Sequence, residues 1–492
     1  MFSARGMAPE DAPKFQALVE DALKQVAEKG FNDTAVEGVA ASTRLSLLLS
    51  TENSNIGASI APNIAYLWAG LGDTNAYSAY VDNTSNYVPF AKAGEYQRVI
   101  GEYLLSNTRT ALVVTKPAPG LKEKQAQALK EDLASRKATM TREELQAIVD
   151  ATKAHGEKKQ DTAEQYIKQL QAVEVSSLPV EKRMHDVTDT LGQDQVRRMH
   201  AQASVSQVGQ AMLLLPAHAL KQEDLHWYKL YTDLLGKLDT QQYDNAQLSA
   251  LMTRYFFQQE LRPTVYTGPM DKGFDPYLRF NWIALDEDMQ PGYDLAYELL
   301  FNTKLDDAQK VKDVVSQAKT SLKQSLTNGV FQLQVYRAFA NTSQGFTYFT
   351  YLNHLDYYAF LEETEKLQSE NPGEALAKLQ GIQSFFKVRT GVISAFAGSE
   401  ESSLVHRAAA DSFLDRLADA ERENAQYQLP QVAHAEGIIV DSAVQYNMLY
   451  APNEALGLTE TTGELDAITL LVSDAFLYPE LREQYGAYGV QH

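Results

Sequence analysis

The composition of the chain changes abruptly at Lys116-Pro-Ala-Pro-Gly120, and the stretch that follows limits the possible folds more than any other feature. Lys, Glu, Gln and Ala dominate this stretch, and Thr141-Arg-Glu-Glu144 is a capping-box pattern that restarts a helix after a break near Thr139. We therefore predict two long antiparallel helices. Their apolar residues are too sparse for an independent core, so the hairpin should lean on other domains or bridge them. The facing apolar positions would be Leu121, Leu129 and Leu133 against Leu145, Ile148 and Val149.

The residues before the hairpin predict an α+β block over 1–117. Apolar residues recur at helical spacing from Pro9 to Gly30, and again from Asp33 to about Leu49. A further helix is expected over 94–105, with strands over 2–7 and 110–115. The hairpin itself then occupies 118–180.

The residues after the hairpin predict two further α+β segments, at 181–398 and 399–492. In the first, strands are expected at about 202–209, 210–215, 265–267, 278–284 and 387–397, and helices at 222–238, 306–328, 346–370 and 372–386. In the second, helices at 402–422 and 463–477 enclose strands at 431–437 and 440–446. The predicted fold class is therefore α+β, with repeated sandwich-like domains of mixed or antiparallel sheets and helices, joined by a long helical hairpin.

The net charge of the chain limits its partners. The chain carries 64 acidic and 44 basic residues, which gives a formal charge of -20. Such a surface repels phosphate backbones and anionic lipid, so nucleic acid and membranes are not expected as partners, whereas basic or unstructured peptides should be attracted. No apolar run approaches the roughly 20 residues that span a bilayer, and the first residues lack the pattern of a signal peptide. We therefore expect a soluble, cytoplasmic chain.

The available side chains restrict the chemistry of the chain. Cysteine is absent, which excludes thiolate metal sites and a cysteine nucleophile. A zinc peptidase needs two histidines one helical turn apart beside a carboxylate, and the sequence has neither His-Glu-x-x-His nor His-x-x-Glu-His. The Gly-x-Ser-x-Gly and Gly-x-x-x-x-Gly-Lys patterns are also missing. The sequence thus predicts no metal site and no catalytic residue in this chain, and His354 is interpreted as a helix-surface or packed histidine beside Tyr357 and Tyr358.

Aromatic residues are concentrated around the same histidine. The run 348–352, Tyr-Phe-Thr-Tyr-Leu, and the pair Tyr357 and Tyr358 could line a peptide groove. Their helical spacing favours core packing instead. The nearby Glu362, Glu363 and Glu365 are interpreted as a solvated helix face.

The last stretch of the chain, Tyr478 to Gly489, combines an arginine at a helix end with a tyrosine six residues later. Gly486 between Arg482 and Tyr488, with Gly489 after them, permits a tight backbone, so the two side chains could direct their donors at one carbonyl oxygen. By the pattern alone, an ordinary helix stop followed by a strand is the favoured interpretation.

Four stretches of the chain resemble one known family. They are Pro9-Glu-Asp-Ala-Pro-Lys-Phe15, the hairpin from Leu121-Lys-Glu-Lys124 to Arg142-Glu-Glu-Leu-Gln-Ala-Ile-Val149, the sequence His185-Asp-Val187, and the segment Leu481 to Gly489. Together they resemble the insulinase and pitrilysin group of zinc metallopeptidases, in the branch of the mitochondrial and chloroplast presequence proteases. The resemblance covers nearly the whole chain.

The resemblance carries expectations about fold and site. In that family four similar α+β domains form a two-half clamshell joined by the hairpin, which encloses unfolded peptides and cleaves them at a zinc in the first domain. By position, 1–117 would end the second domain, 181–398 would be a non-catalytic third domain, and 399–492 would begin the fourth. Arg482 and Tyr488 would bind the peptide near the scissile bond and polarise its carbonyl. Tyr485 stands where the family usually has a first glycine.

The resemblance also implies where the zinc is bound. In that family the inverted zinc motif and its distal glutamate precede the point where this sequence begins. The expected zinc of the parent enzyme is therefore bound outside this chain, and the expected partners are unstructured peptides and a catalytic N-terminal domain, in the same polypeptide or as a separate subunit. The chain should be inactive alone. A peptide-binding subunit without protease activity and an assembly scaffold of helices stay open as alternatives.

Overall fold

The computed structural model describes residues 2–51, 55–72, 86–167, 174–177, 186–205, 207–268, 273–440, 444–458 and 463–490. They belong to two compact units, Met1–Lys29 with Gln97–His185 and Gly30–Tyr96 with Asp186–His492. Helices and a mixed sheet confirm the predicted α+β class. The division into four domains stays a prediction.

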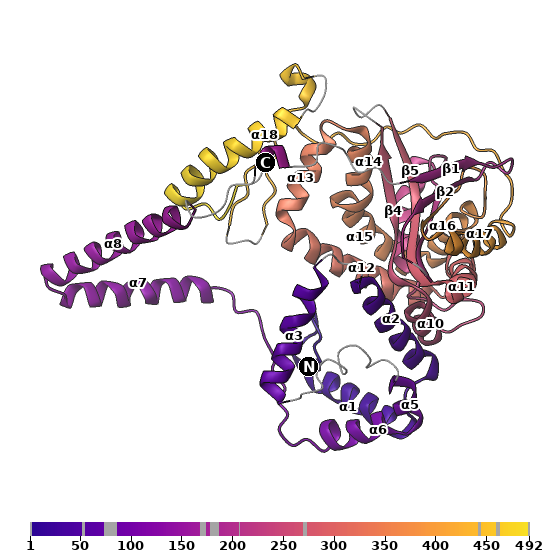
Figure 1. The fold of residues 1–492 in the computed structure, drawn as a ribbon, viewed down its shortest axis with the longest axis horizontal. Coiled ribbons are helices and arrows are strands. Elements are labelled where there is room, and N and C mark those ends of the chain that lie inside the picture. Colours follow the sequence, from indigo (N-terminus) through magenta and orange to yellow (C-terminus); the bar gives the residue numbers. More distant parts are fainter. Residues whose placement is uncertain are drawn as a thin grey trace. The chain divides into compact units, whose positions relative to one another are not determined.

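The first unit contains the predicted hairpin. Helices α7 (Leu121–Thr139) and α8 (Arg142–Ile167) meet at a short connection, which Figure 1 shows in purple. The capping box is formed as expected: the Glu144 N–H donates to Thr141 Oγ1 at 3.2 Å, and the Thr141 N–H donates to Glu144 Oε2 at 2.8 Å. The remaining helices of this unit are η1 (Pro9–Asp11), α1 (Ala12–Lys29) and η3 (Ile100–Leu105).

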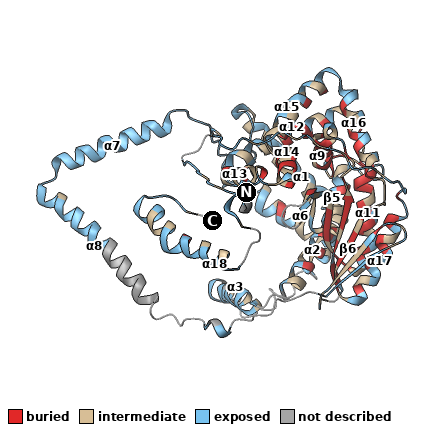
Figure 2. Cartoon of the chain, turned by 90° about the horizontal axis from the view of Figure 1, so that it is seen from above, coloured by how far each residue is buried: buried red, intermediate tan, exposed pale blue. Residues whose placement is uncertain are grey.

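The hairpin helices do not bury the apolar residues that were expected to face each other. Leu129 is 59% exposed and Ile148 is 51% exposed. Figure 2 shows α7 and the described start of α8 as almost entirely exposed, and the two helices diverge from their connection. Since so few apolar side chains are available, packing the helices along their length would gain little hydrophobic free energy. The helices were correctly predicted, and their mutual packing was not.

The strands predicted at the start of the chain and before the hairpin are wrong. Residues 2–7 and 110–115 adopt no strand geometry, and the described residues of 1–117 contain helices only. A strand needs a neighbour for its ladder hydrogen bonds, and no strand of the described residues lies beside either segment.

The second unit begins with the helices α2 (Asp33–Thr51), α3 (Ile56–Leu71) and α5 (Tyr87–Lys92). Of these, α2 packs along α10 (Asn245–Tyr255). Gly38 makes the close approach possible, because a Cβ there would lie 3.1 Å from the Arg254 backbone nitrogen. Helix α6 (Glu95–Val99) precedes η3.

One six-stranded sheet lies at the centre of the second unit, in the order β1-β2-β6-β3-β5-β4. Strands β2 and β6 are parallel, and every other neighbouring pair is antiparallel. The strands are β1 (Val187–Leu191), β2 (Arg197–Gln202), β3 (Val208–Pro216), β4 (Phe257–Thr267), β5 (Phe274–Leu285) and β6 (Ile393–Gly398). The expected strand at 202–209 is divided between the end of β2 and the start of β3. Strand β1, exposed along its length, gives no alternating pattern and was missed.

A helical layer covers one face of this sheet. On β5, Leu278, Phe280 and Trp282 alternate into the core, where each is fully buried. A fully buried Phe side chain contributes about 1.5–3 kcal/mol relative to an exposed one. On the other face of β5, Arg279 and Ile283 are only partly buried, whereas Asn281 is buried. The helices of the layer are η5 (Gln222–Asp224), α9 (Leu225–Leu234), η7 (Asp286–Asp288), α11 (Met289–Phe301), α12 (Ala308–Asn328), α13 (Val330–Ala340), α14 (Gln344–Asn353), α15 (Leu355–Glu370), α16 (Pro372–Phe385) and α17 (Glu400–Leu414).

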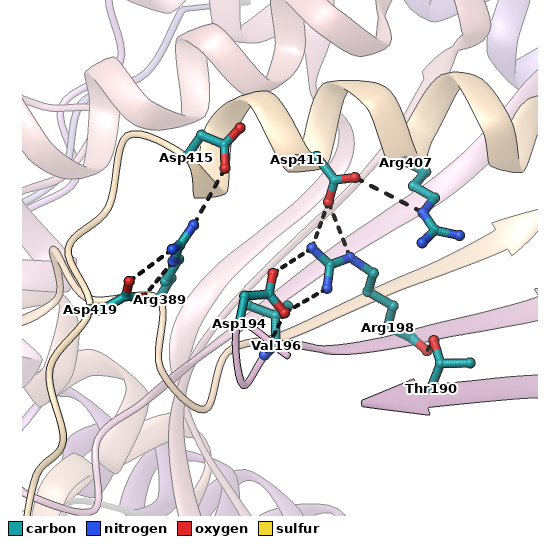
Figure 3. Close-up of polar contacts among 9 residues, drawn as sticks. All are labelled: Thr190, Asp194, Val196, Arg198, Arg389, Arg407, Asp411, Asp415 and Asp419. Atoms are coloured by element: carbon teal, nitrogen blue, oxygen red, sulfur yellow. Dashed lines mark hydrogen bonds and ion pairs between the residues drawn. The ribbon is translucent and has the colours of Figure 1, made fainter. Parts of the chain in front are cut away.

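Ion pairs fasten α17 and the loop after it to the end of the sheet (Figure 3). Arg198 on β2 donates through Nη2 to Asp194 Oδ2 at 2.8 Å and to Asp411 Oδ1 on α17 at 2.7 Å. Arg389, just before β6, donates to Asp419 Oδ1 at 2.6 Å. The hydrogen bond from Arg198 holds the pKa of Asp194 below its usual value, and the bond from Arg389 does the same for Asp419. Both carboxylates therefore stay ionised to low pH.

Two further sequence predictions are corrected by the structure. The helix expected over 346–370 is two helices, because His354, with φ −118° and ψ −126°, ends α14 and begins α15. The strands expected at 431–437 and 440–446 are not formed where the structure describes them, and 441–443 lie outside the described residues. The first of these segments is held against α13 through an ion pair between Arg337 and Glu436. No described strand is available to pair with them.

The N-cap of α10 gives a direct test of this local structure. Asp244 Oδ1 accepts a 2.8 Å hydrogen bond from the Gln247 N–H, and the Gln247 side chain accepts a bond from the Asp244 N–H. We expect Asp244→Ala to lower the free energy of unfolding by about 1 kcal/mol, since it removes an N-cap acceptor. Urea unfolding followed by circular dichroism measures the loss.

The matched control for this prediction is Ser249→Ala on the exposed side of the same helix. It should change the free energy of unfolding by less than about 0.5 kcal/mol. Equal stability of the two variants would show that the cap does not stabilise α10.

Candidate functional site

The segment that carries the predicted site residues is a helix with an irregular end. Helix α18 (Gly463–Val472) continues as the π-helix η9 (Ser473–Gln484), which contains Pro479. The Tyr485 N–H donates to the Glu480 carbonyl at 3.1 Å, and the Ala487 N–H donates to the Leu481 carbonyl at 2.8 Å. π-Helical turns are rare and are found frequently at functional sites.

The glycine expected to tighten this backbone does so. Gly486 has φ +74°, in the left-handed region that a side chain disfavours. Tyr485 has φ −96°, within the right-handed helical region that any residue adopts. The tyrosine that replaces the family's first glycine therefore introduces no backbone strain, and only the second position needs glycine.

Arg482 and Tyr488 both lie at the surface of this segment. The guanidinium carbon of Arg482 is 5.0 Å from the centroid of the Tyr478 ring, and Arg482 forms no ion pair among the described residues. Tyr488 is 92% exposed. No hydrogen bond joins the two side chains within the part of the chain that the structure describes. Arg482 thus lies in the last turn of η9 and Tyr488 lies beyond the end of that helix, and Arg482 contacts Tyr478 instead of Tyr488.

The same segment carries further exposed apolar side chains. Tyr485 is 77% exposed and Phe476 is 59% exposed. Further exposed apolar residues of the same helix are Ile468, Leu470, Leu471, Val472 and Leu481. Large exposed apolar patches are found at sites that bind peptides or other proteins.

The histidines of the helical layer are used for packing. His354 lies between the rings of Tyr336 and Phe349, with centroids 5.3 and 5.8 Å away, and burial lowers its pKa to about 4. His226 stacks on Tyr351 at 4.3 Å, and burial lowers its pKa as well. The interpretation of His354 as a packed histidine is confirmed, with neighbours different from the expected Tyr357 and Tyr358.

The aromatic run beside His354 belongs to the core. Tyr348 and Tyr357 are buried within the main hydrophobic cluster, as their helical spacing predicted. Glu362 and Glu363 are exposed, as expected for a solvated face, whereas Glu365 is partly buried in an ion pair with Lys319.

The described residues do not suit a zinc ion. No three His, Asp or Glu side chains converge within the described ranges in a way that could hold a metal. Zinc needs at least three such protein ligands in a catalytic site. A metal ion held by the described residues therefore has no part in the chemistry of this site. Within the same ranges no helix has the length and apolar character needed to cross a bilayer.

Comparison with protein families gives one match that covers half of the chain. Residues 115–363 match the model of the family described as associated with peptidase family M16, subfamily C. The matched stretch begins just before the hairpin and ends within α15.

Curated relatives match over nearly the whole chain. Protein HypA of Clostridium perfringens is 22% identical over 97% of this chain and 49% of its own length. The mitochondrial presequence protease of Schizosaccharomyces pombe is 20% identical over 98% of this chain and 48% of its own length. The chain thus spans about half the length of these relatives.

Solved structures show weaker likeness. The peptidase M16 inactive domain from Pseudomonas fluorescens aligns with 50% of this chain and 54% of that chain, at a TM-score of 0.35 and 12% identity. Pitrilysin aligns with 51% of this chain and 25% of that chain, at a TM-score of 0.34 and 12% identity.

Proposed function

The chain belongs to the family associated with subfamily C of the M16 peptidases and corresponds to the C-terminal half of an insulinase-type M16 peptidase, and from this premise we propose that it is the substrate-binding, non-catalytic half of a zinc metalloendopeptidase. Its substrates would be unfolded peptides. The observation that carries the proposal is the exposure of Arg482, in the last turn of η9, and of Tyr488 just after it, together with the lack of any described partner that engages the Arg482 guanidinium in an ion pair.

The chemistry of the two side chains suits peptide hydrolysis. When water attacks a peptide carbonyl, negative charge develops on its oxygen, and donors already directed at that oxygen lower the barrier. Arg482 supplies charged N–H donors and Tyr488 supplies one O–H donor. Stacking on Tyr478 would limit the conformational freedom of the guanidinium, so less entropy is lost when it binds substrate.

Peptides as substrates are supported by the relatives and by the charge of the chain. One of the relatives is named as a mitochondrial presequence protease. Presequence-like peptides are rich in arginine and poor in acidic residues, and a chain with a formal charge of -20 attracts them.

The catalytic centre is proposed to lie outside this chain. Metal ligands do not converge among the described residues, so the zinc of the complete enzyme would be held by a partner domain with a His-x-x-Glu-His motif. This chain would then contribute chamber wall, the α7–α8 hairpin and the two donors. A peptide-binding subunit without protease activity is the alternative that the same test decides.

The test compares the chain alone with the chain supplied with its catalytic domain. Zinc content is measured by elemental analysis, and cleavage of a quenched unstructured peptide is followed with and without chelator. We expect neither zinc nor cleavage for the chain alone, and chelator-sensitive cleavage once a domain carrying His-x-x-Glu-His, encoded beside it, is added.

Two outcomes would contradict the proposal. Stoichiometric zinc with chelator-sensitive cleavage by the chain alone would place the catalytic centre in this chain. Peptide binding without cleavage under any combination would favour the binding subunit.

A further inference from the structure

A cavity of about 260 Å³ opens at the end of the sheet of the second unit, and none of its lining residues belongs to η9. Its lining includes Leu215 at the end of β3 and Phe386, which follows α16. The remaining walls are the loops at 388–391 and 420–422 and the residues His218 and Ala219. The volume is slightly below the usual range for small-molecule sites, about 300–1,000 Å³, so a small ligand fits.

One cationic side chain on this cavity has no anionic partner. The Arg422 guanidinium stacks on Phe385, with its carbon 3.8 Å from the ring centroid, and its Nη2 donates to the Phe385 carbonyl. No carboxylate of the described residues pairs with it, and burial lowers the pKa of its guanidinium. A guanidinium has five N–H donors, and among the described residues only the Phe385 carbonyl accepts from one of them.

The wall that holds Arg422 is fixed in place before any ligand binds. The Arg389 N–H donates to the Ala418 carbonyl at 3.0 Å, and the Ala420 N–H donates to Thr390 Oγ1 at 3.2 Å. The Arg389 side chain pairs with Asp419, which lies in the loop after α17 (Figure 3). Because these contacts join the two loops, binding a ligand between them costs little ordering entropy.

We propose that this cavity binds a carboxylate carried on a small apolar group, with Arg422 as the residue that holds the carboxylate. The planar guanidinium matches a carboxylate through two parallel hydrogen bonds. Leu215 and Phe386 provide apolar surface for the body of the ligand. A singly charged carboxylate is favoured over a phosphate dianion, because the exposed Glu421 at the same wall and the net charge of -20 disfavour added negative charge.

Two sources can supply this chemistry, the C-terminus of a short peptide and a free aliphatic acid. The test is calorimetric titration of the full chain with three probes: N-acetyl-alanyl-leucine, its C-terminal amide, and isovalerate. The acid is expected to bind at least about tenfold more tightly than the amide, a difference of about 1.4 kcal/mol. Tighter binding of the peptide acid than of isovalerate identifies a peptide end, and equal binding identifies a small acid. Both results support the carboxylate site.

The variants connect this preference to Arg422. Arg422→Met should reduce binding of the acid to the level of the amide, and Arg422→Lys should restore it in part, because lysine keeps the charge but loses the planar pair of donors. The matched control is Arg416→Met, since Arg416 also stacks on an aromatic ring, 3.4 Å from the Tyr297 centroid, but lies outside the cavity. That variant should bind the acid as the unchanged chain does.

Several results would overturn the proposal. Equal affinity for acid and amide, no measurable binding of either acid, or unchanged binding by Arg422→Met would each do so. If Arg422→Met does not fold, Ala219→Trp fills the cavity and leaves Arg422 in place. If a folded Ala219→Trp chain still binds the acid, the cavity is not the binding site. Because the titration needs no catalytic domain, its outcome is independent of the proposed peptidase function.

Discussion

Arg482→Ala is expected to lower kcat of the reconstituted peptidase by about 100-fold or more, the effect of removing one donor that stabilises a developing oxyanion. Arg482 is exposed and forms no ion pair among the described residues, so its loss should leave the folded state almost unchanged. The measurement is kcat for a quenched unstructured peptide, together with urea unfolding of the same variant. A large fall in rate with unchanged stability assigns Arg482 to substrate binding in the transition state.

The control for this variant is Arg407→Ala. Arg407 is also an exposed helical arginine, with a long 3.9 Å ion pair to Asp411, and it lies on α17. Its removal should leave kcat within about twofold of the unchanged enzyme, since it makes no contact with the proposed peptide surface. An Arg482→Ala enzyme as fast as Arg407→Ala would remove Arg482 from the mechanism. A parallel loss in Tyr488→Phe would support the paired donors.

Acidification from pH 7 to pH 4 is expected to lower the free energy of unfolding by about 3 kcal/mol through His406 alone. His406 is 5% exposed, its Nε2 lies 2.7 Å from the Tyr293 hydroxyl, and its ring stacks on Phe396 at 4.5 Å. Burial lowers its pKa from 6.5 to about 3, with a smaller contribution from His200. Between pH 6.5 and pH 3, His406 is therefore protonated in the unfolded chain but neutral in the folded chain. The stabilisation is complete above pH 6.5 and is lost as the pH falls towards 3.

The measurement is urea unfolding at both pH values for the unchanged chain and for His406→Gln. The substitution removes the titrating group. The fall in the free energy of unfolding from pH 7 to pH 4 should therefore be about 3 kcal/mol smaller in the variant than in the unchanged chain, whatever the stability of the variant at pH 7. His155→Gln is the control, because His155 lies exposed on α8 and should keep the full pH dependence. The same pH dependence in His406→Gln and in the unchanged chain would contradict the assignment.

The helices were predicted well because the signals that define them are local. The capping box at Thr141 and Glu144 formed as predicted, and the periodic stretch from Asp33 became α2. Strands depend on partners that are distant in the chain, so strand predictions failed wherever no partner lies alongside, as at 110–115 and 431–437. The buried β5, which pairs with β3 and β4 on its two sides, was predicted because its side chains alternate into the core.

The sequence by itself determined the family, the helical hairpin and the identity of Arg482 and Tyr488 as candidate residues, because these depend on local patterns and on short motifs. Only the tertiary structure decided that position 485 can hold a tyrosine in place of glycine without strain and that His406 is buried against Tyr293. It also decided that Arg422 lines a cavity and pairs with no carboxylate of the described residues. Burial and the pairing of charges depend on residues far apart in the chain. β3 and the loops at 388–391 and 420–422 are far apart in the sequence and lie next to one another only in the folded chain.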